Sequence, residues 1–202
     1  MFSTKGVNTQ DSKKVSKYFS YGIHQLFIYG VEIKTASTGS KQLTFLMETA
    51  PVNVEGFEPE AGHKGQVGRV AFPGSFIKLE DSKAVEEFNK NIGIIADKLG
   101  VRKQLDELTA PDFDSYVDKI APLFIGKPAW WAIAGEEYLK ADGKTGIRLK
   151  TRRYSFVASL SEGQNHLEKF DPSKAYNFKP VAKPDADSVP AGGVAANNDL
   201  PF

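Results

Sequence analysis

Four side chains around residue 150 have the spacing of one strand face and the chemistry of a surface that binds a polyanion. In IRLKTRRY, residues 147–154, they are Arg148, Lys150, Arg152 and Tyr154. Because successive strand side chains point to opposite faces, a strand here would present three cations in a stripe that ends in an aromatic ring. Cations neutralise phosphates and rings stack on bases, so the stripe predicts contact with a nucleic acid.

Neighbouring strands supply further rings and one further cation. Tyr29 and Arg69 lie in strand-like segments, and Arg69 is expected on the face opposite to Val70. Of the adjacent tryptophans, only one can face inward. We assign Trp131 to the core, which leaves Trp130 over small alanines as a platform for a base.

Two structural interpretations of these residues remain open. Small barrels fill their interiors with aromatic side chains, so Phe27, Tyr29 and Trp130 are equally suited to a core. A basic outer strand also occurs as a solvated edge that blocks aggregation.

No arrangement of residues predicts catalysis. The three histidines, His24, His63 and His166, lie far apart and lack the spacing of metal ligands. A Gly-Lys-Thr sequence begins at Gly143, but a phosphate-binding loop needs a glycine where Tyr138 stands, and a helix should follow it. We therefore expect no enzyme activity, no cofactor and no bound metal.

Composition places the chain among cytoplasmic proteins with an uneven charge distribution. The 202 residues include no cysteine, which fits a reducing compartment, and no run approaches the roughly 18 apolar residues of a membrane helix. The N-terminus has no export signal. The net charge of +1 combines an acidic segment after residue 180 with a basic remainder, which favours an acidic tail beside a basic patch.

The elements that would position these side chains are five strands and a helical insertion. Strands are expected at 20–35, 41–50, 66–73, 127–140 and 147–160. Apolar residues at helical spacing predict a helix over 82–99 and a shorter one around 113–120. This order predicts a mainly β chain, a five-stranded OB-fold barrel with a helical insertion at about 74–126, between the third and fourth strands.

Three segments follow from this order. Residues 1–19 are expected to form an N-terminal arm, 20–179 the OB-fold domain, and 180–202 a disordered linker with a terminal tip. The linker is rich in Pro, Ala, Gly, Asp and Asn, and it cannot bury enough apolar surface to offset the entropy of ordering. The chain then ends on Asp199, Leu200, Pro201 and Phe202.

This ending resembles the C-terminal tip of bacterial and phage single-stranded DNA-binding proteins. In that family an OB-fold is followed by a disordered linker and a short acidic stretch that ends in Pro-Phe. The resemblance implies that Asp199, Leu200, Pro201 and Phe202 bind enzymes of replication, recombination and repair. Asn197 and Asn198 stand where the family usually has acids, which should weaken electrostatic docking or indicate a different partner surface.

The body resembles a group of phage-encoded DNA-binding proteins with an OB-type hairpin. The similarity rests on residues 22–24, 31–34 and 38–41. The long insertion departs from the common bacterial pattern, and it would either support a homodimer or cover one end of the barrel.

The sequence thus predicts a phage protein that binds single-stranded DNA without sequence preference in replication, recombination and repair. Contacts are expected from Tyr29, Arg69, Trp130, Arg148, Lys150, Arg152 and Tyr154. One alternative is a structural or assembly barrel, for example of a virion, whose tail docks on a neighbouring subunit. A second is a nuclease that holds magnesium on loop carboxylates, although no carboxylate constellation is evident.

Overall fold

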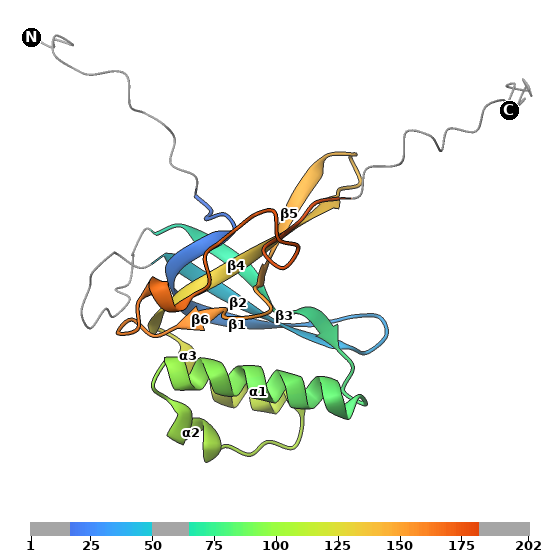
Figure 1. The fold of residues 1–202 in the computed structure, drawn as a ribbon. Helices are drawn as coiled ribbons and strands as arrows, with labels where there is room; N and C mark the ends of the chain where they lie inside the picture. Colours follow the sequence, from blue (N-terminus) through green and yellow to red (C-terminus); the bar gives the residue numbers. More distant parts are fainter. Residues whose placement is uncertain (1–16, 50–64, 182–202) are drawn as a thin grey trace, which may run out of the picture.

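A computed structural model describes residues 17–49 and 65–181, with the side chains of 73–75 left out. The described chain is mainly β, as the sequence predicts, but its sheet has seven strands where five were expected, and it has three α-helices (Figure 1). The strands are β1 (Gly22–Thr35), β2 (Lys41–Thr49), β3 (Val67–Ile77), β4 (Pro128–Leu139), β5 (Thr145–Thr151), β6 (Val157–Ala158) and β7 (Phe178–Lys179). The helices are α1 (Ser82–Lys98), α2 (Arg102–Asp106) and α3 (Phe113–Phe124).

The five long strands form a circuit of pairings. Strand β1 pairs with β2, β2 with β3, β4 with β5, and β4 with β1, all antiparallel. The circuit is completed by β3 and β5, which run parallel and pair at Val70 with Leu149 and at Ala71 with Lys150. Each of these strands therefore has a neighbour on both sides.

Alternation along β2 directs one side of this sheet into the core. Leu43, Phe45 and Met47 are fully buried, as their spacing predicts. The register of β1 against β2 shifts between Ile28 and Gly30, which is the bulge expected near Gly30.

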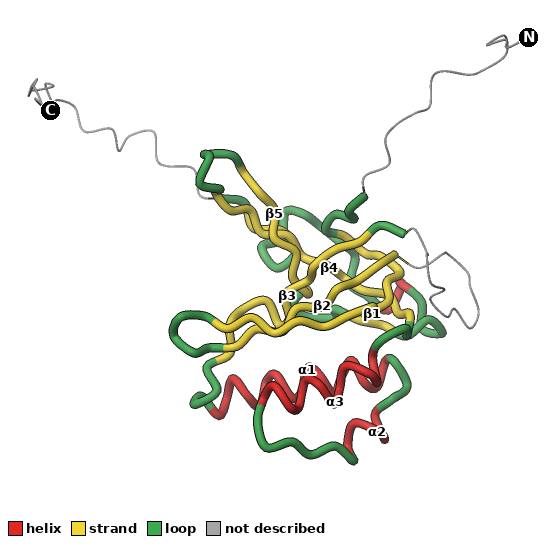
Figure 2. Tube along the Cα trace, turned by 180° about the vertical axis from the view of Figure 1, so that it is seen from behind, coloured by secondary structure: helices red, strands yellow, loops and turns green. Residues whose placement is uncertain are grey.

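The helices pack together against one side of the strands (Figures 1 and 2). Helix α1 begins after Asp81, whose carboxylate accepts hydrogen bonds from the backbone N–H groups of Lys83 and Ala84. Its buried face carries Phe88 and Ile92, at the expected spacing. The short α2 was not predicted, because five residues show no periodicity. No helix within the described ranges is long and apolar enough to span a membrane.

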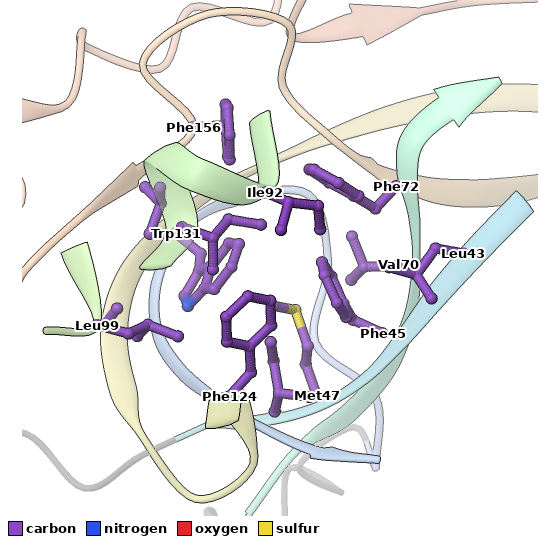
Figure 3. Close-up of a cluster of buried hydrophobic side chains, with 14 of the residues drawn as sticks. Leu43, Phe45, Met47, Val70, Phe72, Ile92, Leu99, Phe124, Trp131 and Phe156 are labelled. Carbon is purple, nitrogen blue, oxygen red and sulfur yellow. The ribbon is translucent and has the colours of Figure 1, made fainter. Parts of the chain in front are cut away.

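The main hydrophobic core joins the helices to the strands (Figure 3). Trp131 is fully buried in it, with its ring centroid 6.1 Å from that of Phe45. The ring centroid of Phe45 in turn lies 5.2 Å from that of Phe72, and Ile92 of α1 belongs to the same cluster. The assignment of Trp131 to the core is confirmed.

Two predicted strand ends are wrong: β3 continues to Ile77 and does not end at residue 73, and β5 ends earlier than expected. Strand β5 ends at Thr151, not at residue 160, because the chain turns sharply before β6 and Ser155 adopts a φ of 44°. The arm expected over 1–19 joins the body by Tyr18, which bridges to Val67 beside the start of β3. The terminal residues 182–202, including the predicted tip, lie outside the described chain.

Glu162 joins the end of α1 to the turn after β6. Its carboxylate accepts hydrogen bonds from Lys98 and from the backbone N–H and hydroxyl of Ser159, and these bonds lower the pKa of Glu162 to about 2. Because the folded pKa lies below the ordinary 4.5, the stabilisation is present above pH 4.5 and is lost as the pH falls toward 2.

We therefore expect Glu162→Gln to lower the thermal unfolding midpoint at pH 7 and to leave it close to wild type near pH 2. Thermal melts followed by circular dichroism at both pH values test this. Equal midpoints at pH 7 would contradict it.

Candidate nucleic-acid interface

A groove of about 900 Å³ lies where β1, the start of β3 and the β4–β5 hairpin meet. Three tyrosine rings that line it are exposed to solvent: Tyr18 by 62%, Tyr29 by 43% and Tyr138 by 39%. The other lining residues are Phe19, Ser20, Tyr21, Lys34, Leu46, Val67, Gly68, Arg69, Ile147, Arg148 and Leu149. We call this hollow the tyrosine groove.

Each tyrosine is held at the groove by a different local feature. Tyr29 follows a run of buried residues in β1 and lies at the bulge, which turns its ring out of the alternating pattern. Tyr18 is placed by its bridge to Val67. Tyr138 lies near the end of β4, in the part of the hairpin that projects from the body (Figure 1).

The wall formed by residues 18–21 is fixed by a close backbone approach. A Cβ atom at Gly68 would come within 2.4 Å of the ring of Phe19, so only glycine lets this buried ring pack directly on β3. The backbone N–H of Phe19 also donates to the carbonyl oxygen of Val67, over 3.3 Å. These contacts hold the segment that carries Tyr18 against the sheet.

Two arginines give the groove its positive charge. The guanidinium of Arg148 lies over the ring of Tyr138, 5.5 Å from its centroid, and has no ion-pair partner among the described residues. Arg69 is exposed on the face opposite to Val70, as predicted, and forms an ion pair with Glu32. Lys34 lies on the same groove wall. The groove thus combines flat apolar rings with cations at its rim.

Arg152 does not belong to this surface. Only 1% of it is exposed, and its guanidinium donates hydrogen bonds to the carbonyl oxygens of Tyr154, Ser155 and Glu168 over 2.8, 2.6 and 2.8 Å. The prediction that Arg152 faces a phosphate is wrong, because β5 ends one residue earlier and strand alternation no longer applies.

Lys150 and Tyr154 lie at a second hollow of about 650 Å³, on the α1 side of β5. Lys150 is ion-paired with Glu136 over 3.2 Å. Partial burial acts to raise the pKa of Glu136, but the hydrogen bonds and charges of Lys150 and Lys179 lower it below its ordinary value. Tyr154 is 56% exposed. The predicted stripe is therefore divided between two hollows and a buried site.

Trp130 is not part of the tyrosine groove. It lies in the first half of β4, half-buried, and packs with Ile23 against the small cluster of Ala132, Ala158 and Leu167. This agrees with the alternative interpretation, in which the side chain of Trp130 packs against the protein and does not stack on a base. Phe27, for which the same alternative was open, is buried.

The sequence pattern missed several of the groove's residues. Tyr18 was assigned to an arm, and Tyr138 was noted only for its place before Gly143. The signal for Tyr138 is its hairpin partner, since the register of β4 and β5 brings it diagonally next to Arg148. Ile147, which alternation places on the face of β5 opposite to Arg148, is 50% exposed at the hairpin and also lines the groove.

The described residues hold no cluster of three or more His, Asp or Glu side chains that could bind a metal ion. His24 is half-buried, burial lowers its pKa, and its Nε2 contacts the carbonyl oxygen of Ser20 over 2.9 Å. His63 and the tip residues Asp199, Leu200, Pro201 and Phe202 fall outside the described ranges.

Comparison with known proteins adds no family to this description. The chain matches no protein-family model and no curated protein.

Proposed function

We propose that this protein binds single-stranded DNA in the tyrosine groove without reading its sequence. The observation that carries the proposal is the convergence of three exposed tyrosine rings, Tyr18, Tyr29 and Tyr138, with Arg69 and Arg148 in one groove. A single strand exposes flat bases and a continuous row of phosphates. Rings that stack on any base and arginines that pair with any phosphate bind it with little sequence preference.

We further propose that the circuit of five strands is an OB-fold barrel. The supporting features are the strand order, the antiparallel neighbours completed by a parallel β3–β5 pair, and the helices between β3 and β4. OB-folds bind oligonucleotides on the face of their second and third strands and on the loops that join strands one to two and four to five. The tyrosine groove is lined by Leu46 of β2 and Arg69 of β3, and by residues of the two strands that flank the β4–β5 loop.

The biological role and the partners rest on the resemblance of the terminal residues. We propose a phage protein that protects single strands in the host cytoplasm during replication, recombination and repair. It would need no cofactor and would catalyse no reaction. Asp199, Leu200, Pro201 and Phe202 would recruit replication or recombination enzymes, since the ring of Phe202 and the carboxylate of Asp199 suit an apolar pocket with a basic rim.

A structural or assembly protein is the second candidate. The observation that favours it is the apolar surface of the projecting hairpin, where Leu139 is 62% exposed beside Ile147. Such a surface would pack on a neighbouring subunit and would not need DNA. This candidate predicts no salt-sensitive binding of oligonucleotides.

The proposal is tested by the fluorescence anisotropy of an end-labelled oligothymidylate titrated with protein at several salt concentrations. A labelled strand is the better probe, because Trp131 is buried and Trp130 lies outside the groove. We expect binding whose logarithmic salt slope is about −0.7 for each phosphate contacted. Oligomers of thymine and cytosine should bind similarly, and a duplex more weakly. Absence of binding at low salt would reject the proposal.

We expect Glu32→Gln to increase the affinity for oligothymidylate by about two- to fivefold at low salt. The change frees the guanidinium of Arg69, which lines the groove, from its carboxylate partner and removes a negative charge beside it. Anisotropy titrations of both proteins measure the ratio, which should shrink at high salt. Because an exposed ion pair contributes only about 0–1 kcal/mol to stability, the unfolding midpoint should change little. A loss of affinity in Glu32→Gln would contradict the expectation.

A further inference from the structure

We propose that a bound strand continues out of the tyrosine groove into a second contact site beside α1, formed by Phe76, Lys150, Arg153 and Tyr154. We call this site the α1 hollow. The inference rests on the proposed function, because it extends the same strand beyond the groove. It adds Phe76 and Arg153, which the sequence pattern did not single out.

The two hollows follow one another along the same pair of strands. Strand β3 contributes Val67–Arg69 to the tyrosine groove and its last residues, Phe76 and Ile77, to the α1 hollow. Strand β5 contributes residues 147–149 to the tyrosine groove and residues 150–151 to the α1 hollow. The parallel β3–β5 pairing lies between them. A strand of DNA that follows the seam between β3 and β5 therefore meets both hollows in turn.

The step between the hollows is short. Arg148 and Lys150 are two residues apart on β5, which places their Cα atoms about 7 Å apart, and their side chains leave the same face of the strand. Arg148 lines the tyrosine groove and Lys150 lines the α1 hollow. These two cations can thus contact nearby phosphates of one strand.

The α1 hollow repeats the chemistry of the tyrosine groove. The guanidinium of Arg153 lies over the ring of Tyr154, 5.1 Å from its centroid, as that of Arg148 lies over Tyr138. Among the described residues Arg153, like Arg148, has no ion-pair partner. An arginine held over an exposed ring offers a cation for a phosphate and a flat surface for a base.

Phe76 supplies the second ring. It is 44% exposed at the end of β3, although the neighbouring Ile77 is buried. The hollow also contains Glu87, and an adjoining hollow of about 600 Å³ carries Lys83 and Lys90 of α1 together with Arg153. The mixed charges make this the weaker of the two contact sites, so a long strand should be needed to engage it.

The test compares Arg153→Ala with wild type on two oligothymidylates, one of about 5 nucleotides and one of about 16. These lengths lie near the lower and upper ends of the number of nucleotides that one OB-fold binds. Anisotropy titrations at several salt concentrations give affinities and salt slopes. For the long strand we expect about a fivefold loss of affinity and a salt slope smaller by about 0.7, the value for one lost phosphate contact. For the short strand the affinity should change less than twofold.

The control is Lys103→Ala, which removes one exposed positive charge from α2, on the far side of the helices from the β4–β5 hairpin (Figure 1). It should behave as wild type with both strands. An equal loss on both lengths in Arg153→Ala, or no loss on either, would overturn the inference, and the latter would reassign the α1 hollow to a protein ligand. Failure of the wild type to bind either strand at low salt would instead reject the proposed function, so the two failures are distinguishable.

Discussion

Replacing Arg152 with alanine is expected to lower the free energy of unfolding by about 3 kcal/mol. The guanidinium is buried and donates to three backbone carbonyls, and its Nη1 lies 3.5 Å from Oδ1 of Asn177. A hydrogen bond from a charged group contributes about 1.5–3 kcal/mol to the free energy of unfolding. The buried carbonyl oxygens that lose their donor lower the stability of the variant further. Burial lowers the pKa of Arg152, an effect that the charge of Glu168 opposes, but the group stays charged at neutral pH.

The loss should appear as a thermal midpoint lower by about 6–12 °C for a chain of this size. Arg153→Ala is the matched control, because it removes the same side chain one position later, where it is exposed. Its midpoint should stay within 2 °C of wild type. Below the transition temperature, Arg152→Ala should bind an oligothymidylate of about 5 nucleotides, which occupies only the tyrosine groove, as wild type does. The converse result, a stable Arg152→Ala protein with weak DNA binding, would show that Arg152 contacts DNA and does not mainly stabilise the fold.

Replacing Tyr29 with alanine is expected to weaken the binding of oligothymidylate by about 5- to 150-fold. Stacking of a base on an aromatic ring contributes about 1–3 kcal/mol, and each 1.4 kcal/mol is a factor of ten. Tyr29 is exposed at a bulge, so its removal should disturb the core little. The same reasoning applies to Tyr138, and the double variant should lose more than either single one.

Tyr29→Phe is the control for this prediction. It keeps the ring and removes only the hydroxyl, so its affinity should stay within about threefold of wild type. Anisotropy titration at constant salt measures wild type and the four variants, and circular dichroism verifies their folding. Equal losses in Tyr29→Phe and Tyr29→Ala would show that the hydroxyl, and not stacking, makes the contact.

Most of the fold could be predicted because alternation and helical spacing are local signals. Leu43, Phe45 and Met47 fixed the inner face of β2, and Asp81 marked the start of α1. The end of β5 could not be predicted in this way. The residues after Thr151 are still of types that favour strands, such as Tyr154, Phe156 and Val157. The turn at Ser155 is instead held by the buried Arg152, which also donates to the distant carbonyl oxygen of Glu168.

The local nature of these signals also explains which residues of the candidate site could be predicted from the sequence. The exposure of Arg69 was predicted, because it alternates with the buried Val70 in β3, whereas Tyr29 was left open between the core and the surface. The places of Lys150 and Tyr154 depend on how β5 twists and ends, and that of Tyr138 depends on the register of a hairpin. Alternation assigns residues to a face of one strand, but it does not say which strands form the walls of one groove.

The central claim is that a single strand of DNA lies in the tyrosine groove, and photocrosslinking tests it most directly. An oligothymidylate that carries 5-iodouracil is bound to the full chain and irradiated, and the crosslinked peptides are identified by mass spectrometry. We predict crosslinks at Tyr29 and Tyr138, competed by unlabelled strand and suppressed by high salt. Crosslinks confined to other surfaces, such as α2 and α3, with none at either tyrosine, would contradict the account.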